Sequence, residues 1–95
     1  MTQPFSIERS QLTVGTILLR IRGELDARNA QDMVEESKRV LVAGENLVLN
    51  LSGVSFIASS GIGALLALVE EFRRGPGTLR LAAISPPVDA VVRLL

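Results

Sequence analysis

The segment Phe56-Ile57-Ala58-Ser59-Ser60-Gly61-Ile62-Gly63-Ala64-Leu65-Leu66 decides how the rest of the chain is arranged. Residues 47–51 before it have the composition of a buried strand, and the apolar residues 64–72 after it predict a helix. Two adjacent hydroxyls therefore stand where a strand passes into a helix. The first turn of a helix presents unpaired backbone N–H groups and the positive end of the helix dipole, so an anion is stabilised there.

Two interpretations of this turn are open. Gly61 and Gly63 are expected to leave the surface free of side-chain bulk, so that a phosphate or the backbone of another protein can approach closely. The structural alternative is that Ser59 or Ser60 caps the helix and that the glycines only shape the turn. The local pattern by itself favours the structural alternative.

Composition narrows the classes of function. The 95 residues suffice for one domain, and 47% of them are hydrophobic, with three Phe and no Trp or Tyr, which predicts an aliphatic core. Ten basic and ten acidic residues cancel, which disfavours nucleic acid and anionic membranes as partners. The chain has no Cys and no His, which removes disulfides and nearly all zinc-site designs. Neither a metal nor a cofactor is expected.

Neither a targeting signal nor a membrane span is expected. The N-terminus lacks the basic and apolar regions of a secretory signal. Residues 46–69 carry no charge, but they contain Asn50 together with several Ser and Gly, and their pattern predicts a strand, a turn and a helix. We therefore expect an intracellular protein that does not insert into a membrane.

The chain predicts four strands and three helices. Strands are expected at residues 5–9, 14–22, 47–51 and 78–84, with a turn at Ser10-Gln11 between the first two. Asp26 is expected to cap a helix that ends at Gly44, and this capping role is the default for Asp26. A second helix, residues 60–74, is expected to be the most buried. Ser85 is expected to cap a third helix that carries Val88, Val91, Val92 and Leu95 at helical spacing.

This order predicts an α/β fold with a mixed, mainly parallel four-stranded sheet. Right-handed crossovers between parallel strands place the helices chiefly on one face of the sheet. The strands at 14–22 and 78–84 alternate apolar residues with Arg and Thr, which indicates that the other face is open.

Four segments together resemble a STAS domain, and more narrowly an anti-sigma factor antagonist. They are Gly23-Glu24-Leu25-Asp26, Leu49-Asn50-Leu51 with Val54-Ser55-Phe56-Ile57, Ser59-Ser60-Gly61-Ile62-Gly63, and Ala83-Ile84-Ser85-Pro86. The resemblance covers essentially the whole chain, residues 1–95, as a single domain. Four segments in the right order and spacing are more specific than any one of them alone.

The resemblance implies a cytoplasmic regulator without catalysis that binds an ATP-dependent serine kinase, which is also the anti-sigma factor. In the family the first Ser of an Asp-Ser-Ser-Gly turn is the phosphoacceptor, which corresponds to Ser59 here. Phosphorylation adds about 1.5 to 2 negative charges and breaks the complex. The partner-binding residues implied by the resemblance and the topology are Asp26, Ala58, Ser60, Gly61, Ile62 and Gly63. A homodimer is left open.

The sequence departs from the family pattern in two places. Ala58 stands where the family turn has Asp, which bears on recognition by the kinase. The family domain also continues into another strand or helix, whereas this chain ends at the apolar Leu94-Leu95. We expect either a shortened form of the domain or completion by a partner.

The sequence leaves two other functions to compare with this one. A STAS scaffold or accessory subunit of a transporter or lipid-transport complex, never phosphorylated, is favoured by Ala58 and disfavoured by Ser59-Ser60-Gly61. An enzyme with Ser59 as nucleophile is disfavoured, because the chain has no His and its one Lys, Lys38, lies late in the first predicted helix. Adjacent carboxylates on a helix, Glu35-Glu36 and Glu70-Glu71, point in different directions and do not predict a paired-carboxylate site.

Overall fold

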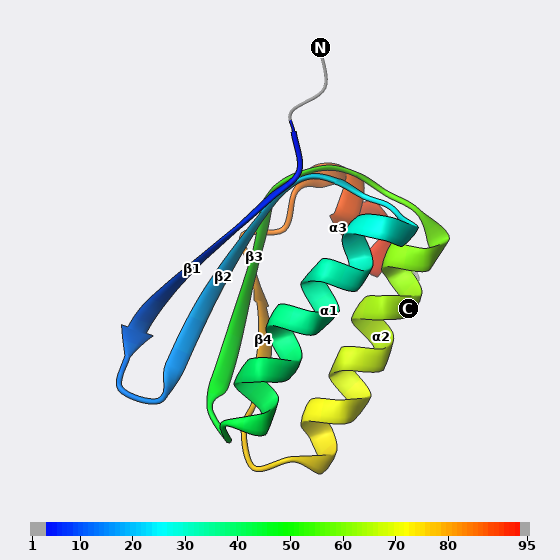
Figure 1. Cartoon of the computed structure of the whole chain (residues 1–95). Helices are drawn as coiled ribbons and strands as arrows, with labels where there is room; N and C mark the ends of the chain where they lie inside the picture. The colour runs from blue at the N-terminus through cyan, green and yellow to red at the C-terminus, as the bar shows by residue number, and fades with distance from the viewer. Residues whose placement is uncertain (1–3, 94–95) are drawn as a thin grey trace.

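The sheet has four strands in the order β1-β2-β3-β4 in the computed structural model, which describes residues 4–93 (Figure 1). The strands are β1 (Ser6–Thr13), β2 (Thr16–Leu25), β3 (Asn46–Ile57) and β4 (Leu79–Ala82). β1 pairs with β2 in antiparallel fashion, whereas β2 with β3 and β3 with β4 are parallel. The predicted mixed, mainly parallel sheet is confirmed.

Three helices follow the strands: α1 (Ala27–Val42), α2 (Ser59–Arg74) and α3 (Pro86–Val92). Figure 1 shows α1 and α2 side by side over one face of the sheet, with α3 at the end of the sheet where both of these helices begin. The core beneath them is aliphatic apart from Met33 and Phe72, and it includes Leu19, Leu49 and Leu65. A single apolar layer between the sheet and the helices therefore holds the domain together.

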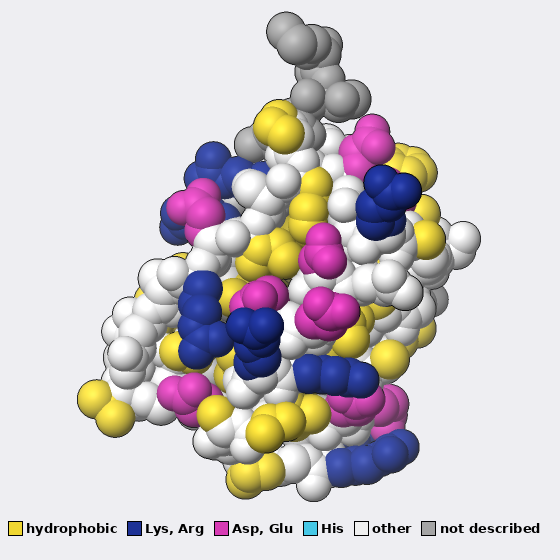
Figure 2. Space-filling model, viewed as in Figure 1, with side chains coloured by type: hydrophobic (Ala, Val, Ile, Leu, Met, Phe, Trp, Pro, Cys, Tyr) yellow, Lys and Arg dark blue, Asp and Glu magenta, His cyan; other side chains and the backbone are white. Residues whose placement is uncertain are grey.

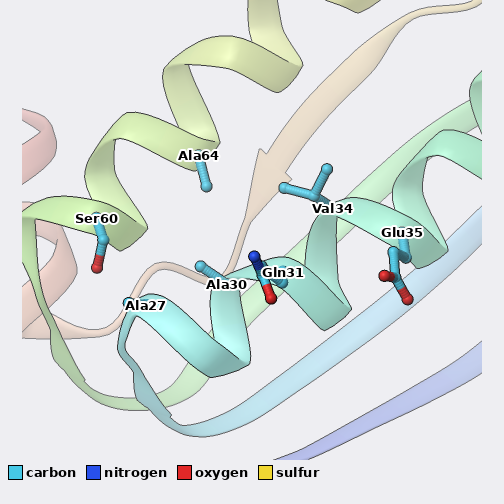
Figure 3. A pocket seen from close by; sticks show the side chains of 7 residues that line it. All are labelled: Ala27, Ala30, Gln31, Val34, Glu35, Ser60 and Ala64. Atoms are coloured by element: carbon cyan, nitrogen blue, oxygen red, sulfur yellow. The ribbon is translucent and has the colours of Figure 1, made fainter.

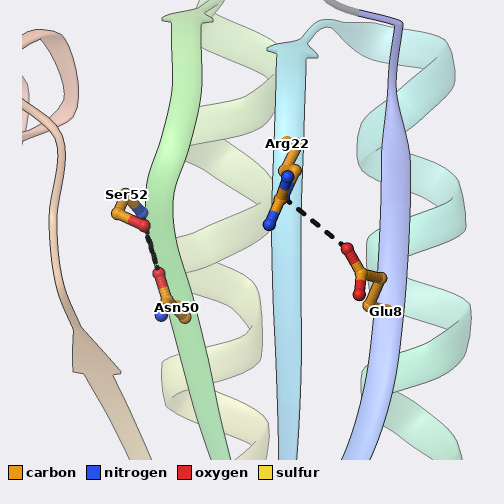
Figure 4. A network of polar contacts seen from close by, with 4 residues as sticks. All are labelled: Glu8, Arg22, Asn50 and Ser52. Carbon is orange, nitrogen blue, oxygen red and sulfur yellow. Dashed lines mark hydrogen bonds and ion pairs between the residues drawn. The ribbon is translucent and has the colours of Figure 1, made fainter.

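The other face of the sheet is polar and open, as predicted. β2 alternates strictly, so that Leu19 and Ile21 are buried while Arg20 and Arg22 point the other way. Figure 4 shows this face with the helices behind it: Arg22 Nε lies 3.6 Å from Glu8 Oε1, and Ser52 Oγ donates to Asn50 Oδ1 at 2.7 Å.

The turn between the first two strands lies later than predicted. β1 continues through the expected turn at Ser10-Gln11, and the chain reverses at Val14-Gly15, where Thr13 pairs with Thr16. Gly15, the third residue of the turn at residues 13–16, has φ +82°, a left-handed conformation that a type II turn requires at this position and that glycine adopts without strain. The alternating pattern predicted the presence of β1, but the position of Gly15 determined where β1 ends.

Two other strand boundaries also differ from the prediction. β3 does not end near residue 51 but runs to Ile57, because its second half pairs with β2 up to Leu25 opposite Ile57. β4 is shorter than residues 78–84 and ends at Ala82, and the next residue, Ala83, has φ +50°, which is incompatible with a strand.

The predicted ranking of helix burial was wrong. α2 buries Gly61, Leu65, Leu68 and Phe72, but α1 also buries four residues, and Leu66 on α2 is 45% exposed. α1 ends as predicted, with Gly44 at φ +73° after the last turn.

α3 is held by Ser85, a buried residue whose Oγ donates to the backbone oxygen of Val54 at 2.7 Å. The apolar Leu94-Leu95 end, for which a shortened domain or completion by a partner is expected, lies outside the described residues.

Candidate functional site

The first turns of α1 and α2 meet at one end of the sheet because they follow two neighbouring parallel strands. β2 leads through Asp26 into α1, and β3 leads through Ala58 into α2. The Ala58 N–H donates to the backbone oxygen of Leu25 at 3.0 Å, which ties the two strand ends together. The predicted neighbourhood of Asp26 and the Ser59 turn is therefore confirmed.

Asp26 is the N-cap of α1. Its Oδ1 accepts from the backbone N–H of Asn29 at 2.9 Å, and the Asn29 side chain donates to the backbone oxygen of Glu24 at 2.8 Å. These bonds fix how the chain leaves β2 and enters α1. The capping role predicted for Asp26 is confirmed, whereas contact with a partner stays a prediction.

The cap of α2 differs from the expectation. The N-cap is Ala58, with extended backbone angles (φ −82°, ψ 166°) and no side-chain hydrogen bond to the helix. Ser59 and Ser60 are already the first two helical residues, and both are exposed. The interpretation of either serine as the cap was wrong, and the N–H groups of this first turn have no side-chain acceptor from Ala58.

The two glycines of the turn have different surroundings. Gly61 is buried, and a Cβ built on it would lie 2.5 Å from the Leu25 backbone oxygen and 3.0 Å from Ile57 Cγ1. Gly63 is exposed, and a Cβ there would meet nothing within 4 Å. Only Gly63 therefore leaves open space at the surface, while Gly61 lets α2 dock on the end of β2. Ile62 between them is half-buried.

Two large apolar side chains near the turn were not singled out from the sequence. Phe56 at the end of β3 is 52% exposed, and Leu66 on α2 is 45% exposed. Leu66 falls outside the buried spacing of Leu65, Leu68 and Phe72, a signal that was available in the helical period. Phe56 pairs in register with Glu24, which is only visible once β3 is known to continue that far.

A groove of about 350 Å³ opens between α1 and α2 next to the turn. Figure 3 shows its lining, which consists of Ala27, Ala30, Gln31, Val34, Glu35, Ser60 and Ala64. Ser60 thus belongs both to the turn and to the groove, whose existence the sequence did not indicate. On the face drawn in Figure 2, acidic and basic side chains are interspersed without a patch of one sign.

Residues 4–93 lack two other features that would indicate a function. No group of three or more Asp, Glu, His or Cys side chains there is arranged to hold a metal ion. None of the helices in that range combines the length and apolarity needed to span a bilayer.

Comparison with known proteins identifies the family to which this fold belongs. A family model described as the STAS domain matches residues 9–95. The anti-sigma F factor antagonist of Paenibacillus polymyxa is 30% identical over 81 residues, which cover 82% of this chain and 68% of that protein. The anti-sigma-F factor antagonist RsfA of Mycobacterium tuberculosis is 30% identical over 79 residues, covering 80% of this chain and 62% of that protein. The chain thus spans about two thirds of the length of these relatives.

Similarity to solved structures indicates the same family. SpoIIAA, an anti-sigma factor antagonist, matches in its unphosphorylated form with a TM-score of 0.74 at 26% identity, over 94% of this chain and 79% of that one. The phosphorylated form, from Bacillus, matches with a TM-score of 0.73 at 25% identity, over 94% and 82% of the two chains. With the strand order, the helix layer and nearly the whole length in agreement, this chain belongs to the STAS domain family.

Proposed function

We propose that this protein is an anti-sigma factor antagonist that binds a serine-kinase anti-sigma factor and is switched off by phosphorylation of Ser59. The contact surface is the Ser59 turn, defined as Ala58, Ser59, Ser60, Ile62 and Gly63, together with the neighbouring Asp26. Gly61 supports this surface from below, because it is buried against Leu25. The protein acts by binding, without catalysis.

The observation that carries the proposal is the position of Ser59. Its side chain is exposed in the first turn of α2, on a helix whose N-cap supplies no side-chain hydrogen bond. A kinase can reach such a hydroxyl without unfolding the domain. The similarity to SpoIIAA, which has a phosphorylated form, supports the same assignment.

The position of Ser59 at the start of a helix favours control of binding by phosphorylation. A phosphate at a helix N-terminus is stabilised by the unpaired N–H groups and the helix dipole, so the free phosphoprotein stays folded. In a packed interface the same phosphate adds bulk and a charge of about −1.5 to −2 that must be desolvated. Phosphorylation therefore weakens the complex much more than it weakens the fold.

The exposed apolar side chains beside the turn give this surface its binding energy. Phe56 and Leu66 are 52% and 45% exposed, and covering them with a partner removes apolar surface from water, which favours binding. The open space above Gly63 allows a partner to approach the backbone of α2 closely.

The test is a phosphorylation and binding assay with ATP and each purified anti-sigma factor kinase of the source organism. We expect one phosphate on Ser59 by mass spectrometry. Ser59→Ala should bind the kinase constitutively, and Ser59→Asp should bind weakly, because the carboxylate imitates part of the charge and bulk. Ser60→Ala is the matched control and should still be phosphorylated.

Other outcomes separate the alternatives. Modification of Ser60 instead of Ser59 would show the acceptor to be wrong. A chain that binds the kinase but is never modified would be a binder without a switch, in line with Ala58 replacing the family Asp. Absence of binding to every kinase would reject the proposal in favour of the STAS scaffold of a transporter or lipid-transport complex.

A further inference from the structure

We infer that the groove between α1 and α2 holds a segment of the same anti-sigma partner, one that inserts an apolar side chain and places a Lys or Arg beside Glu35. This inference rests on the proposed function. It extends the contact from the Ser59 turn along the helix pair and defines the chemistry of the partner segment.

The groove exists because small side chains face each other in the first halves of the two helices. Ala30 of α1 and Ala64 of α2 both line it, and neither side chain is long enough to close the gap. Farther along, the helices are joined: Lys38 Nζ lies 3.8 Å from Glu71 Oε1, and Leu41 Cδ1 lies 3.0 Å from where a Cβ on Gly75 would stand. The pair is therefore closed at one end and open at the end that carries Ser59.

The lining is chemically divided. Four of the residues that line the groove are apolar, Ala27, Ala30, Val34 and Ala64, and three are polar, Gln31, Glu35 and Ser60. The volume of about 350 Å³ is near the lower end of the range of about 300 to 1,000 Å³ for ligand sites. A recess of this size, with small apolar side chains from both helices, suits one anchoring side chain of a protein partner.

The two ends of the groove differ in charge. Figure 3 shows Ser60 at one end and Glu35 at the other. Glu35 is exposed, and within the described residues no Lys or Arg nitrogen lies within 4.0 Å of its carboxylate. Asp32, one turn earlier on α1, is also exposed, but it lines a separate hollow beside β1 that includes Arg9 and does not line the groove. A cation is the complementary group for the Glu35 end.

The charge at the Glu35 end indicates which kind of molecule binds in the groove. A second copy of the chain would bring the carboxylate of Glu35 toward the same group across a two-fold axis, where like charges repel. A free phosphate or another anion is disfavoured for the same reason. A different protein with an apolar and a basic side chain complements both the apolar lining residues and Glu35.

The groove is continuous with the switch, since Ser60 belongs to both and follows Ser59 directly. Glu35 is eight residues beyond Ala27, so the acidic end lies about 12 Å along α1 from the first turn. A phosphate on Ser59 would then act at one end, while the basic side chain of the partner is held at the other. Binding strength and its control by phosphorylation can therefore be altered separately.

The binding test uses the purified kinase that binds the wild-type chain in the assay above. Ala64→Leu fills the groove, and Glu35→Lys reverses its charge; each should raise Kd at least tenfold. Ala43→Leu, at the exposed C-cap of α1, and Glu70→Lys, on the outer surface of α2, make the same chemical changes elsewhere. These controls should stay within twofold of wild type. The Kd of Glu35→Lys should also depend less on salt.

A cross-linking test does not depend on Ala64→Leu folding. The chain has no Cys, so Gln31→Cys introduces a unique attachment point at the rim of the groove for a photo-cross-linker. It should capture a kinase peptide that contains an apolar residue near a Lys or Arg. Val42→Cys, 85% exposed at the other end of α1, should capture none.

The outcomes separate this inference from the proposed function. If the wild-type chain binds the kinase, but both groove variants bind as well as their controls, the partner does not occupy the groove and only this inference is overturned. If Gln31→Cys captures a peptide without a basic residue, the assigned chemistry is wrong. If no kinase binds the wild-type chain, the proposed function fails and the inference fails with it.

Discussion

Gly61 and Gly63 are separated by one residue but serve opposite purposes. The first faces inward, where only a hydrogen atom fits between α2 and the backbone of Leu25. The second faces outward, where the helix would accept any side chain. Absence of a side chain is thus a packing requirement at one position and a surface property at the other.

Alanine substitutions should separate these roles. Gly61→Ala forces α2 away from Leu25 and Ile57, so we expect it to lower the free energy of unfolding by about 1 to 3 kcal/mol. Gly63→Ala gains helix propensity without a clash and should raise it by about 0.5 to 1 kcal/mol. Urea denaturation monitored by circular dichroism measures both. Equal effects of the two variants would contradict the packing described for Gly61.

At the scale of elements, α1 and α2 begin at the same edge of the sheet with different caps. Asp26 accepts a hydrogen bond from the first turn of α1, whereas Ala58 offers none to α2. α2 therefore keeps its N–H groups available to an external acceptor at the position proposed for phosphorylation.

Exchanging the caps should change stability in opposite directions. Asp26→Ala removes the bond to Asn29 and should cost about 1 kcal/mol, whereas Ala58→Asp supplies a cap to α2 and should stabilise by a similar amount. Thermal unfolding of both variants measures the difference.

The same variants bear on the proposed binding. Loss of kinase binding in Asp26→Ala with unchanged stability would mean that Asp26 acts mainly as a contact. Ala58→Asp also restores the residue that the family turn carries, so faster phosphorylation of Ser59 in this variant would show that the carboxylate serves recognition.

For the whole molecule, stability should be distributed according to strand position. Residues 47–50 of β3 pair with β2 on one side and β4 on the other, whereas β1 and β4 are edge strands. We expect the amides of residues 47–50 to exchange slowest with deuterium, and those near Val14 at the hairpin tip to exchange fastest. Rapid exchange at residues 47–50 would contradict β3 as the centre of the sheet.

Much of the site could be inferred before the structure. The strand, turn and helix order put Asp26 and Ser59 at the ends of adjacent parallel strands, because right-handed crossovers leave few alternatives. The groove could not be inferred, since it depends on which faces of α1 and α2 meet and on how closely the helices approach. That spacing follows from side-chain packing between residues far apart in the sequence, such as Leu41 of α1 against Gly75 after α2.

The sequence by itself determined the number, type and order of the elements, since these follow from local periodicity and from residues such as Gly44, which permits a left-handed conformation after α1. Only the tertiary structure decided where β3 ends and which residue caps α2. β3 reaches Ile57 because β2 supplies hydrogen-bond partners that far, and α2 begins at Ser59 because Ala58 is bonded to Leu25. A strand or helix end depends on what lies beside it, which a local pattern does not contain.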